Sequence, residues 1–379
     1  MKIHLWFPGI FDFKGGIQVF STFFINAIET VLPNADRSVF LKNDKCQSTN
    51  LQFDSRTQFY CSGQWTSTFL HTPYFTIQVL FSAISNKPDL IICGHVNFSP
   101  IAYKISSLLN IPYWVIIYGV DVWDLKDINK AKGLKSADKI ISISQYTTDR
   151  VVKEQNIDPN KIVLLHNPIE LNRFQVSSKP AYLLDRYKIP SDQFIILTVA
   201  RLSRSEKYKG YDKILEALPK IIKSIPNVHY LLVGQGDDTD RIKNIIKNLN
   251  IESSVTLTGF VSDGELCDHY NLCDVFAMPS KKEGFGFVYI EAMACGKPCL
   301  GGNQDGALDA LANGDLGALV NPDDIDEISN TLIQILQKTY PNPLLYEPEQ
   351  LRQAVIDRFG FEIFQQRLHQ YLDDFIACS

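Results

Sequence analysis

Several features that would place a chain in a special class are missing from this sequence. It contains no run of eighteen apolar residues, so no membrane-spanning helix is expected. It has neither a low-complexity tract nor a visible internal repeat, which argues against disordered and solenoid architectures. Residues 1–9 are too short and too interrupted an apolar stretch for a secretory signal, and they predict a buried strand that ends in a loop.

Metal-binding cysteine patterns are missing as well. The eight cysteines are scattered, and no pair has C-x-x-C spacing. Cys295 and Cys299 flank a Gly-Lys-Pro turn without an accompanying His or Cys pair, so they do not indicate a metal site. Without a secretory signal, we expect reduced thiols and a cytoplasmic location.

The chain also lacks a strong excess of charge, because 37 Lys and Arg oppose 42 Asp and Glu. The small imbalance is uneven. Residues 1–180 hold 18 basic and 14 acidic side chains (+4), and the rest holds 19 and 28 (−9). The acidic C-terminal half argues against nucleic acid as a partner, whereas the basic first half suits an anionic membrane surface.

Short apolar runs alternate with amphipathic helical stretches along the whole chain. Such alternation, with fully apolar strands, predicts an α/β fold of parallel sheets covered by helices on both faces. The candidate strands are Ile3–Phe7, Leu90–Cys93, Tyr113–Tyr118, Lys139–Ser142, Ile162–Leu165, Ile195–Ala200, His229–Val233, Val255–Leu257, Val275–Met278 and Pro298–Leu300.

A segment rich in Ser, Lys and Pro, Phe174–Gln193, marks the best domain boundary. We therefore expect two Rossmann-like doubly wound domains, 1–175 and 190–355, that face each other across a cleft. Ligands of such sheets bind at the carboxyl ends of the strands. An amphipathic C-terminal helix, within 356–379, could pack on either domain and could cross back to the first.

Two carboxylates, Glu283 and Glu291, stand eight residues apart and form the most informative motif. A glycine loop, Gly284-Phe285-Gly286, follows the first carboxylate, and Phe287 leads into a helical pattern. Free N–H groups at a helix start suit oxyanions and sugar hydroxyls, and each carboxylate can accept two hydrogen bonds from a vicinal diol. The motif indicates a binding site for a nucleotide sugar, although an exposed loop acid and a helix-surface glutamate would give the same spacing.

Two cations follow the first strand of the second half. Arg201 leaves the carboxyl end of that strand, and Lys209 directly precedes Gly210, which could open the next helix. Lys207 is the alternative to Lys209. Together, the two cations could bind a pyrophosphate and neutralise a leaving group, although surface charges are the usual fate of Lys and Arg.

Further candidates lie where other strands run into glycine or polar residues. A glycine pair near the first helix could approach a phosphate, and two later strand ends could contact a nucleotide. A dinucleotide fingerprint is incomplete at Gly234, so the sequence does not favour NAD. These donor-site candidates are Gly15, Gly16, Gly234, Phe260 and Val261. The acceptor or sugar candidates are His95, Asn97, Tyr118 and Asp121, and a capping or turn role is the alternative for His95 and Asn97.

Read together, these segments resemble the retaining glycosyltransferases of family 4, which have the two-domain GT-B fold. The resemblance is strongest in "ILTVARLS", "YLLVGQGDD", "VTLTGFV", "EGFGFVYIEAMACGKP" and "GALVNPDD". The chain departs from many relatives in having Tyr118 before Gly119 in place of a histidine, and Asp309 where glutamate is common.

The resemblance implies a role for each matched residue. Arg201 and Lys209 would bind the donor diphosphate, and Gly16 would approach it from the other domain. Glu291 would hold the ribose hydroxyls. Glu283 and the following loop N–H groups would contact the transferred sugar, and the segment at Phe260 and Val261 would lie near the base. No metal ion or other cofactor is implied, and no D-x-D motif stands at a plausible donor strand.

The implied activity is transfer of a hexosyl group, with retention, from a nucleoside diphosphate sugar to a saccharide or lipid-linked saccharide in envelope or exopolysaccharide synthesis. UDP-glucose is slightly favoured as donor over GDP-mannose. The alternatives are a sugar-nucleotide epimerase or phosphorylase of the same fold, and a non-catalytic membrane-associated scaffold. Whether Glu283 acts as a nucleophile stays open.

A lysine cluster suggests peripheral binding at the inner face of the plasma membrane. The cluster lies near Trp123 and Leu125, and the aromatic stretch Trp65–Phe81 precedes it. A solvated loop is the alternative. The lysines are Lys126, Lys130, Lys132, Lys135 and Lys139.

Overall fold

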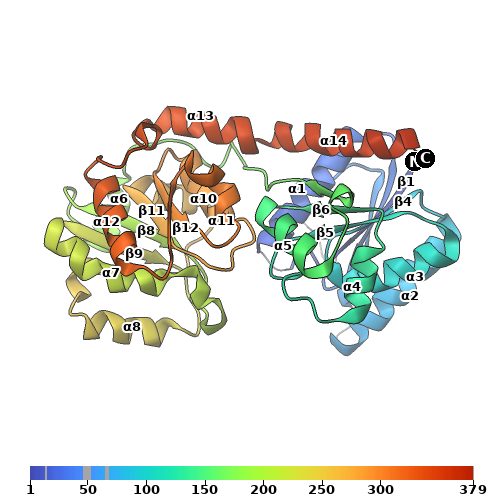
Figure 1. Ribbon diagram of the computed structural model, residues 1–379, viewed down its shortest axis with the longest axis horizontal. Coiled ribbons are helices and arrows are strands. Elements are labelled where there is room, and N and C mark those ends of the chain that lie inside the picture. The colour runs from blue at the N-terminus through green and yellow to red at the C-terminus, as the bar shows by residue number, and fades with distance from the viewer. Residues whose placement is uncertain (13–14, 46–52, 65–67, 379) are drawn as a thin grey trace. The chain divides into compact units, whose positions relative to one another are not determined.

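The computed structural model describes residues 1–12, 15–45, 53–64 and 68–378. The chain divides into two compact units (Figure 1). Unit 1 comprises Met1–Pro168 and Phe361–Ser379, and unit 2 comprises Ile169–Gly360. The expected boundary segment, Phe174–Gln193, therefore belongs to unit 2, and the C-terminal helix belongs to unit 1.

Unit 1 is built on a seven-stranded sheet in the order β3-β2-β1-β4-β5-β6-β7. All neighbouring strands are parallel. The central strands are buried on both faces, which explains their continuous apolar sequences. The strands are β1 (Lys2–Phe7), β2 (Asp36–Leu41), β3 (Thr57–Cys61), β4 (Leu90–Cys93), β5 (Tyr113–Ile117), β6 (Lys139–Ser142) and β7 (Ile162–Leu164).

Helices connect most of the consecutive strands of unit 1, and α14 lies alongside α1 (Figure 1). Nowhere in the described part of the chain is a helix long and apolar enough to cross a membrane. The helices are α1 (Gly16–Val31), α2 (Thr68–Asn86), α3 (Ser99–Leu109), α4 (Ile128–Lys135), α5 (Gln145–Gln155) and α14 (Phe361–Cys378).

Unit 2 repeats this plan with a six-stranded parallel sheet in the order β10-β9-β8-β11-β12-β13. The strands are β8 (Phe194–Val199), β9 (Val228–Val233), β10 (Val255–Gly259), β11 (Val275–Met278), β12 (Cys299–Gly302) and β13 (Ala318–Val320). The helices are α6 (Ala181–Tyr187), α7 (Tyr211–Ser224), α8 (Thr239–Asn248), α9 (Leu266–Leu272), α10 (Phe287–Ala294), α11 (Ala307–Ala310), α12 (Ile325–Leu336) and α13 (Pro348–Phe359).

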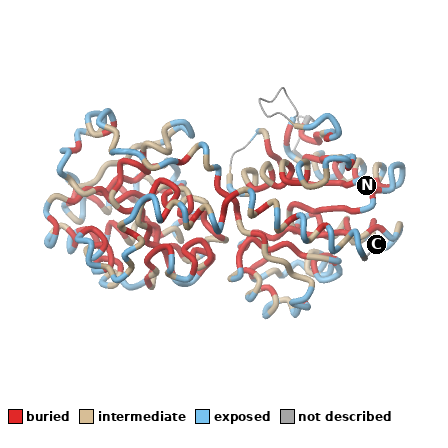
Figure 2. Tube along the Cα trace, turned by 90° about the horizontal axis from the view of Figure 1, so that it is seen from above, coloured by how far each residue is buried: buried red, intermediate tan, exposed pale blue. Residues whose placement is uncertain are grey.

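The interior of each unit is apolar, and exposed residues lie mostly along helices and loops (Figure 2). One apolar core lies around β1, β4 and β5 in unit 1, and another around α7, α12 and β9 in unit 2. The α/β class with two parallel Rossmann-like sheets is therefore confirmed.

Three strands, β2, β3 and β13, escaped the sequence analysis. Strand β2 begins with three polar residues, so its apolar signal is short. The second of them, Arg37, is only 1% exposed. Its guanidinium donates hydrogen bonds of 2.8 Å to Thr57 Oγ1, the Leu32 carbonyl and Asp54 Oδ1. These partners satisfy a buried charge that the sequence pattern presents as a surface residue.

The cysteines depart from expectation at one position. Cys61 is disulfide-bonded, so the expectation that all thiols are reduced is wrong there. Among the cysteines whose side chains the structure describes, the free ones are Cys93, Cys267, Cys273, Cys295 and Cys299.

Strand order reverses once in each sheet, between β1 and β4 in unit 1 and between β8 and β11 in unit 2. Loops that leave such neighbouring strands in opposite directions open a crevice at their carboxyl ends, where ligands of open α/β sheets bind. In unit 2, the loops after β8 and β11 carry Arg201 and Glu283. The fold thus brings residues 82 positions apart in sequence to one edge of one sheet.

Helix α14 is anchored to unit 1 by aromatic packing. The ring of Phe364, 3% exposed, lies edge-on to Phe20 and Phe24, at centroid distances of 5.6 Å and 6.5 Å. The hydroxyl of Tyr371 donates a hydrogen bond of 2.7 Å to the Leu164 carbonyl. The last helix of the chain is therefore part of the core of the first unit.

We expect Phe364→Ala to destabilise unit 1 by about 3–5 kcal/mol, because the substitution opens a cavity between two helices. All four tryptophans belong to unit 1, so tryptophan fluorescence during urea unfolding reports on this unit. Ile376→Ala, at a side chain that is 47% exposed on the same helix, is the matched control and should shift the transition little. Equal shifts for both variants would contradict the anchoring role.

Candidate active site

Four charged side chains meet at the switch point of the unit 2 sheet. Glu206 is buried and forms ion pairs with both Arg201 and Lys209. The Lys209 Nζ lies 3.9 Å from Glu206 Oε2. The Lys209 Nζ lies 3.0 Å from Glu283 Oε2. The ion pairs therefore form one chain in which cations and carboxylates alternate, in the order Arg201, Glu206, Lys209 and Glu283.

Close backbone packing brings Lys209 to this position. The next residue, Gly210, has φ of 75° and separates the short 3-10 segment Arg204–Lys209 from α7. A Cβ atom at Gly210 would lie 2.3 Å from the Pro279 carbonyl oxygen. Only glycine permits this approach, which seats Lys209 against the loop that follows β11.

The electrostatics of the cluster keep Lys209 charged. Burial alone would lower the pKa of Lys209, but the neighbouring carboxylates of Glu283 and Glu206 outweigh it, and its pKa is raised. A half-buried ammonium of this kind is held by carboxylates that a more highly charged anion could replace.

Asp305 fixes the loop that carries Glu283. One carboxylate oxygen of Asp305 accepts hydrogen bonds of 2.7 Å from the Glu283 N–H and the Ser280 hydroxyl. The other oxygen accepts a hydrogen bond of 2.9 Å from the Ala307 N–H. The Gly306 N–H also donates a hydrogen bond of 2.8 Å to the Glu283 carbonyl, which closes the loop further. Burial raises the pKa of Asp305 to about 6.

The glycine loop leads directly into α10. Gly286 has φ of 93°, and a Cβ atom there would lie 2.6 Å from the Tyr289 ring, so the turn requires glycine. Phe285 is 1% exposed and packs against Phe359, whereas Gly284 and Phe287 are half-buried. Gly286 provides no side-chain cap, and the first turn contains no acid. The helix start is therefore open to a ligand's oxygen atoms through its backbone alone.

Glu291 lies on α10 itself and is half-buried. Its Oε2 accepts a hydrogen bond of 2.7 Å from the hydroxyl of Tyr270 on α9. Tyr270 is fully buried, so the carboxylate is oriented by a residue that cannot turn away. Both glutamates of the motif thus have fixed positions within unit 2.

The remaining candidate residues of unit 2 are Gly234, which acts through its backbone, and Phe260 and Val261, which offer side chains. A Cβ atom at Gly234 would lie 1.8 Å from the Ala200 carbonyl oxygen, so this glycine allows the β9 loop to pack against the segment that leads into Arg201. Phe260 is 73% exposed at the end of β10, and Val261 is half-buried. Gly234 therefore supports the site, and Phe260 offers a free aromatic surface.

In unit 1, helix α1 begins at Gly16 with Gly15 as its N-terminal cap residue. No side chain caps this end, and its first turn contains no acid. His95 caps a short 3-10 turn, where its Nδ1 accepts a hydrogen bond of 3.1 Å from the N–H of exposed Asn97. Burial, then Lys130 and Lys42, lower the pKa of His95 to about 4, so it is neutral near pH 7.

Tyr118 and Asp121 occupy more enclosed positions. Tyr118 is 8% exposed, and its ring lies edge-on to Phe20 at 5.4 Å. Asp121 Oδ1 accepts a hydrogen bond of 3.0 Å from the Tyr118 N–H, and burial raises the pKa of Asp121 to about 7. These contacts hold both residues in the turn after β5.

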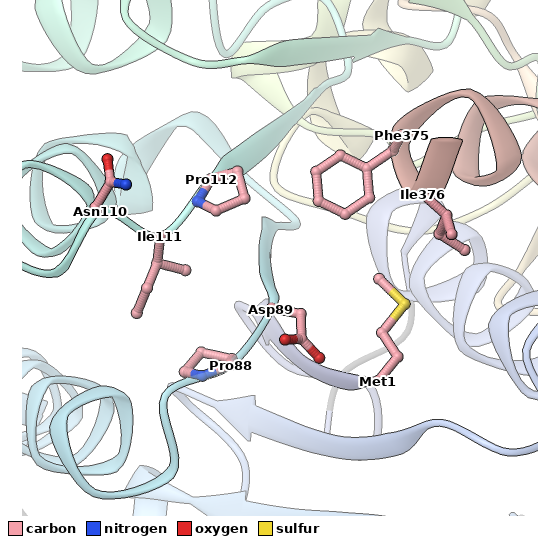
Figure 3. Close-up of a pocket in the computed structure, with 8 residues that line it drawn as sticks. All are labelled: Met1, Pro88, Asp89, Asn110, Ile111, Pro112, Phe375 and Ile376. Atoms are coloured by element: carbon pink, nitrogen blue, oxygen red, sulfur yellow. The ribbon is translucent and has the colours of Figure 1, made fainter. Parts of the chain in front are cut away.

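A cavity of about 600 Å³ lies elsewhere in unit 1, at the amino ends of β1, β4 and β5 (Figure 3). Met1, Asp89, Pro112 and Phe375 are among its lining residues. This edge is opposite the carboxyl ends of the strands, so the cavity does not coincide with the predicted ligand residues.

Known families match both parts of the chain. The family described as "Glycosyl transferases group 1" matches residues 183–354, and "Glycosyltransferase Family 4" matches residues 50–173. The chain therefore carries a group 1 glycosyl transferase domain and a family 4 glycosyltransferase domain. These matches do not favour an epimerase or a phosphorylase.

The curated relatives match over part of their length. A GDP-mannose-dependent alpha-(1-6)-phosphatidylinositol monomannoside mannosyltransferase of Mycolicibacterium smegmatis is 29% identical over 53% of this chain and 53% of its own. An N-acetyl-alpha-D-glucosaminyl L-malate synthase of Bacillus anthracis is 27% identical over 61% of this chain and 58% of its own. The chain therefore spans little more than half the length of these curated relatives.

Solved structures match over the whole chain and show the fold. Anabaena Alr3699/HepE in complex with UDP has a TM-score of 0.78 at 18% identity and covers 99% of this chain and 100% of its own. Sucrose-phosphate synthase (tll1590) from Thermosynechococcus elongatus has a TM-score of 0.80 at 20% identity, with full coverage of both chains (100% each).

Three supporting residues were missed by the sequence analysis. Glu206 stands three residues before Lys209, a spacing that permits an ion pair within one helical turn. Asp305 and Tyr270 reach Glu283 and Glu291 from 22 and 21 positions away, and no local pattern signals such contacts.

Asp305→Ala should loosen the loop that carries Glu283, because it removes the acceptor of two backbone N–H groups. Hydrogen bonds to charged groups contribute about 1.5–3 kcal/mol each, so amide exchange at Glu283 and Ala307 should accelerate at least about tenfold. Hydrogen exchange with mass spectrometry measures this. The control is Asp315→Ala, at an exposed position. Unchanged exchange at both amides would contradict the role of Asp305.

Proposed function

We propose that this chain transfers a hexosyl group, with retention, from a nucleoside diphosphate sugar to a saccharide or lipid-linked saccharide acceptor. The observation that carries the proposal is the alternation of Arg201, Glu206, Lys209 and Glu283 at the switch point of the unit 2 sheet. Before the donor binds, the carboxylates hold the cations in place. A diphosphate, with more charge than one carboxylate, then binds to cations that are already oriented.

The remaining donor contacts follow from α10. Glu291, oriented by Tyr270, accepts hydrogen bonds from the ribose hydroxyls. Glu283 and the backbone N–H groups of the glycine loop contact the hydroxyls of the transferred sugar. The exposed ring of Phe260 supports the base.

The chemical step is proposed to need positioning and charge stabilisation, with no metal ion. The bond between the anomeric carbon and the diphosphate breaks, and the diphosphate gains negative charge that Arg201 and Lys209 stabilise. The acceptor hydroxyl attacks from the face that the diphosphate leaves, and its proton passes to the departing phosphate oxygen. Glu283 then needs no nucleophilic role, which suits a carboxylate held 3.0 Å from an ammonium.

UDP-glucose is the first donor to test and GDP-mannose the second. Solved relatives of this fold are complexes with UDP and with UDP-glucose. The curated relative from Mycolicibacterium smegmatis is named for GDP-mannose. Calorimetric titration with UDP, GDP, UDP-glucose and GDP-mannose compares the two bases directly. Absence of binding heat with all four ligands would contradict the proposal.

Glu291→Gln should weaken donor binding about tenfold to a hundredfold, because a neutral amide loses charge-assisted hydrogen bonds to the ribose. The amide oxygen can still accept from Tyr270, so the fold should persist. Glu216→Gln, on the surface of α7, is the matched control. Calorimetry with the better nucleotide measures the change, and equal affinities in variant and control would place the ribose elsewhere.

Arg201→Ala should lower kcat about 10²–10³-fold with little change in KM, because the charge on the diphosphate develops in the transition state. Initial rates of donor hydrolysis or transfer measure this. Lys213→Ala removes a cation that pairs with Glu216 on α7, and it should leave kcat unchanged. A rise in KM alone for Arg201→Ala would assign this residue to ground-state binding.

We also propose that unit 1 binds an anionic membrane surface through α2. Helix α2 has no Asp, Glu, Lys or Arg, and it buries Phe75, Val79 and Ala83. Its opposite side is apolar as well. The exposed apolar side chains there are Phe69 (89%), Leu70 (49%), Tyr74 (37%), Ile77 (65%), Phe81 (71%) and Ile84 (49%). An uncovered stripe of this kind suits the boundary between lipid headgroups and acyl chains.

Exposed cations lie on α3 and α4, and one of them, Lys132, belongs to the cluster expected from the sequence. Lys104 on α3 and Lys132 on α4 are exposed, and α3 packs against both α2 and α4. Lys139 lies over the Trp114 ring, and Trp123 is 8% exposed, so neither matches the expected docking surface. Trp65 lies outside the described residues. The exposed apolar side of α2 is therefore the proposed membrane-binding surface.

The double substitution Ile77→Ser and Phe81→Ser should reduce sedimentation with vesicles of phosphatidylglycerol and phosphatidylcholine at least about tenfold, since it removes buried apolar area. Ile376→Ser, at an exposed residue of α14, is the control and should sediment like the unaltered protein. Added salt should weaken the binding. Equal sedimentation of both variants would remove α2 from the proposal.

A further inference from the structure

Two free cysteines face each other between α9 and α10 in unit 2. The Sγ atoms of Cys267 and Cys295 lie 3.8 Å apart. Cys267 belongs to α9 and is half-buried, and Cys295 directly follows α10 and is fully buried. A disulfide needs about 2.05 Å between sulfurs, so closing this pair requires a shift of roughly 1.8 Å.

The surroundings make the two thiols unequal. The thiols of Cys267 and Cys295 share a hydrogen bond in which either sulfur can be the donor, and the Asn271 amide donates to Cys267 Sγ at 3.4 Å. The hydrogen bond with Cys295 is the main cause that lowers the pKa of Cys267 to about 6, whereas that bond and then burial raise the pKa of Cys295. Cys267 is thus both the more accessible and the more acidic of the two thiols.

We propose that Cys267 and Cys295 form a reversible oxidation site that takes hydrogen peroxide as its oxidant. The Cys267 thiolate attacks one peroxide oxygen and breaks the O–O bond, which gives a sulfenic acid and hydroxide. The Cys295 sulfur then attacks the Cys267 sulfur, its proton passes to the departing hydroxide, and a disulfide and water form. In total, two thiols and one peroxide give one disulfide and two waters.

The site is coupled to the motif helix by two short connections. The Cys295 N–H donates a hydrogen bond of 3.2 Å to the carbonyl of Glu291, one turn earlier. On the facing helix, Tyr270 stands three residues after Cys267 and holds the Glu291 carboxylate. Drawing the sulfurs together therefore moves both the helix that carries Glu291 and the hydroxyl that orients it.

This coupling rests on the proposed function of Glu291. A displacement on the order of 1 Å is enough to disturb a preorganised contact. We expect the cross-linked protein to bind the nucleoside diphosphate about tenfold more weakly than the reduced protein.

The test treats the full-length protein with one equivalent of hydrogen peroxide. Intact mass should show loss of two hydrogen atoms, and peptide mapping should place the new cross-link between Cys267 and Cys295. Dithiothreitol should reverse it. The rate of cross-linking should be half-maximal near pH 6, as the pKa of Cys267 sets the thiolate fraction.

Cys267→Ser and Cys295→Ser should each abolish the cross-link, and Cys295→Ser should leave Cys267 as a trappable sulfenic acid. Cys299→Ser, at a fully buried free thiol, should cross-link like the unaltered protein. Oxidation elsewhere, or Cys267 oxidation without a cross-link, would overturn the proposal.

Calorimetry of the cross-linked protein with UDP or GDP then tests the coupling separately. Unchanged affinity would overturn the coupling. Absence of nucleotide binding by the reduced protein would overturn the proposed function, and the mass readout would still decide the thiol site.

Discussion

The arrangement of unit 2 depends on one ion pair, between Lys209 Nζ and Glu283 Oε2 at 3.0 Å. Half-buried charges are costly unless they are paired, so each partner requires the other to stay in place. Gly210 allows the close backbone approach that seats Lys209, and Asp305 holds the backbone of Glu283. Glu206 adds Arg201 to the same network. A charged network preorganised in this way can exchange a carboxylate for a phosphate without moving its cations far.

Parallel sheets explain why this network lies where it does. Neighbouring strands β8 and β11 lead their loops away in opposite directions, so the carboxyl ends of these strands open at one edge. In unit 1 the strand order reverses between β1 and β4. The uncapped start of α1 and the His95 turn follow the carboxyl ends of these two strands. The cavity at the opposite edge of that sheet is an independent feature of unit 1.

Prediction from sequence succeeded where a signal is local and failed where it is not. Apolar runs located strands such as β4 and β6 to the residue, because both faces of these strands are buried. Strand β2 was missed because buried Arg37 finds its partners at Leu32, Asp54 and Thr57, which only the fold brings together. The candidate acceptor residue Tyr118 packs against Phe20, a contact that no local pattern signals. A polar residue at a strand end has the same sequence pattern whether it faces a ligand or the core.

The sequence by itself determined the α/β class, the family resemblance, the glutamate pair and the cations, because these depend on residue type and short spacing. Only the tertiary structure decided which groups support them. Glu206 joins two cations, Tyr270 orients Glu291, and Cys267 meets Cys295, which lies 28 positions further along the chain. Hydrogen bonds and ion pairs act over a few ångströms in space, whatever the separation along the chain. Partners on different helices and loops are therefore found by folding and not by spacing.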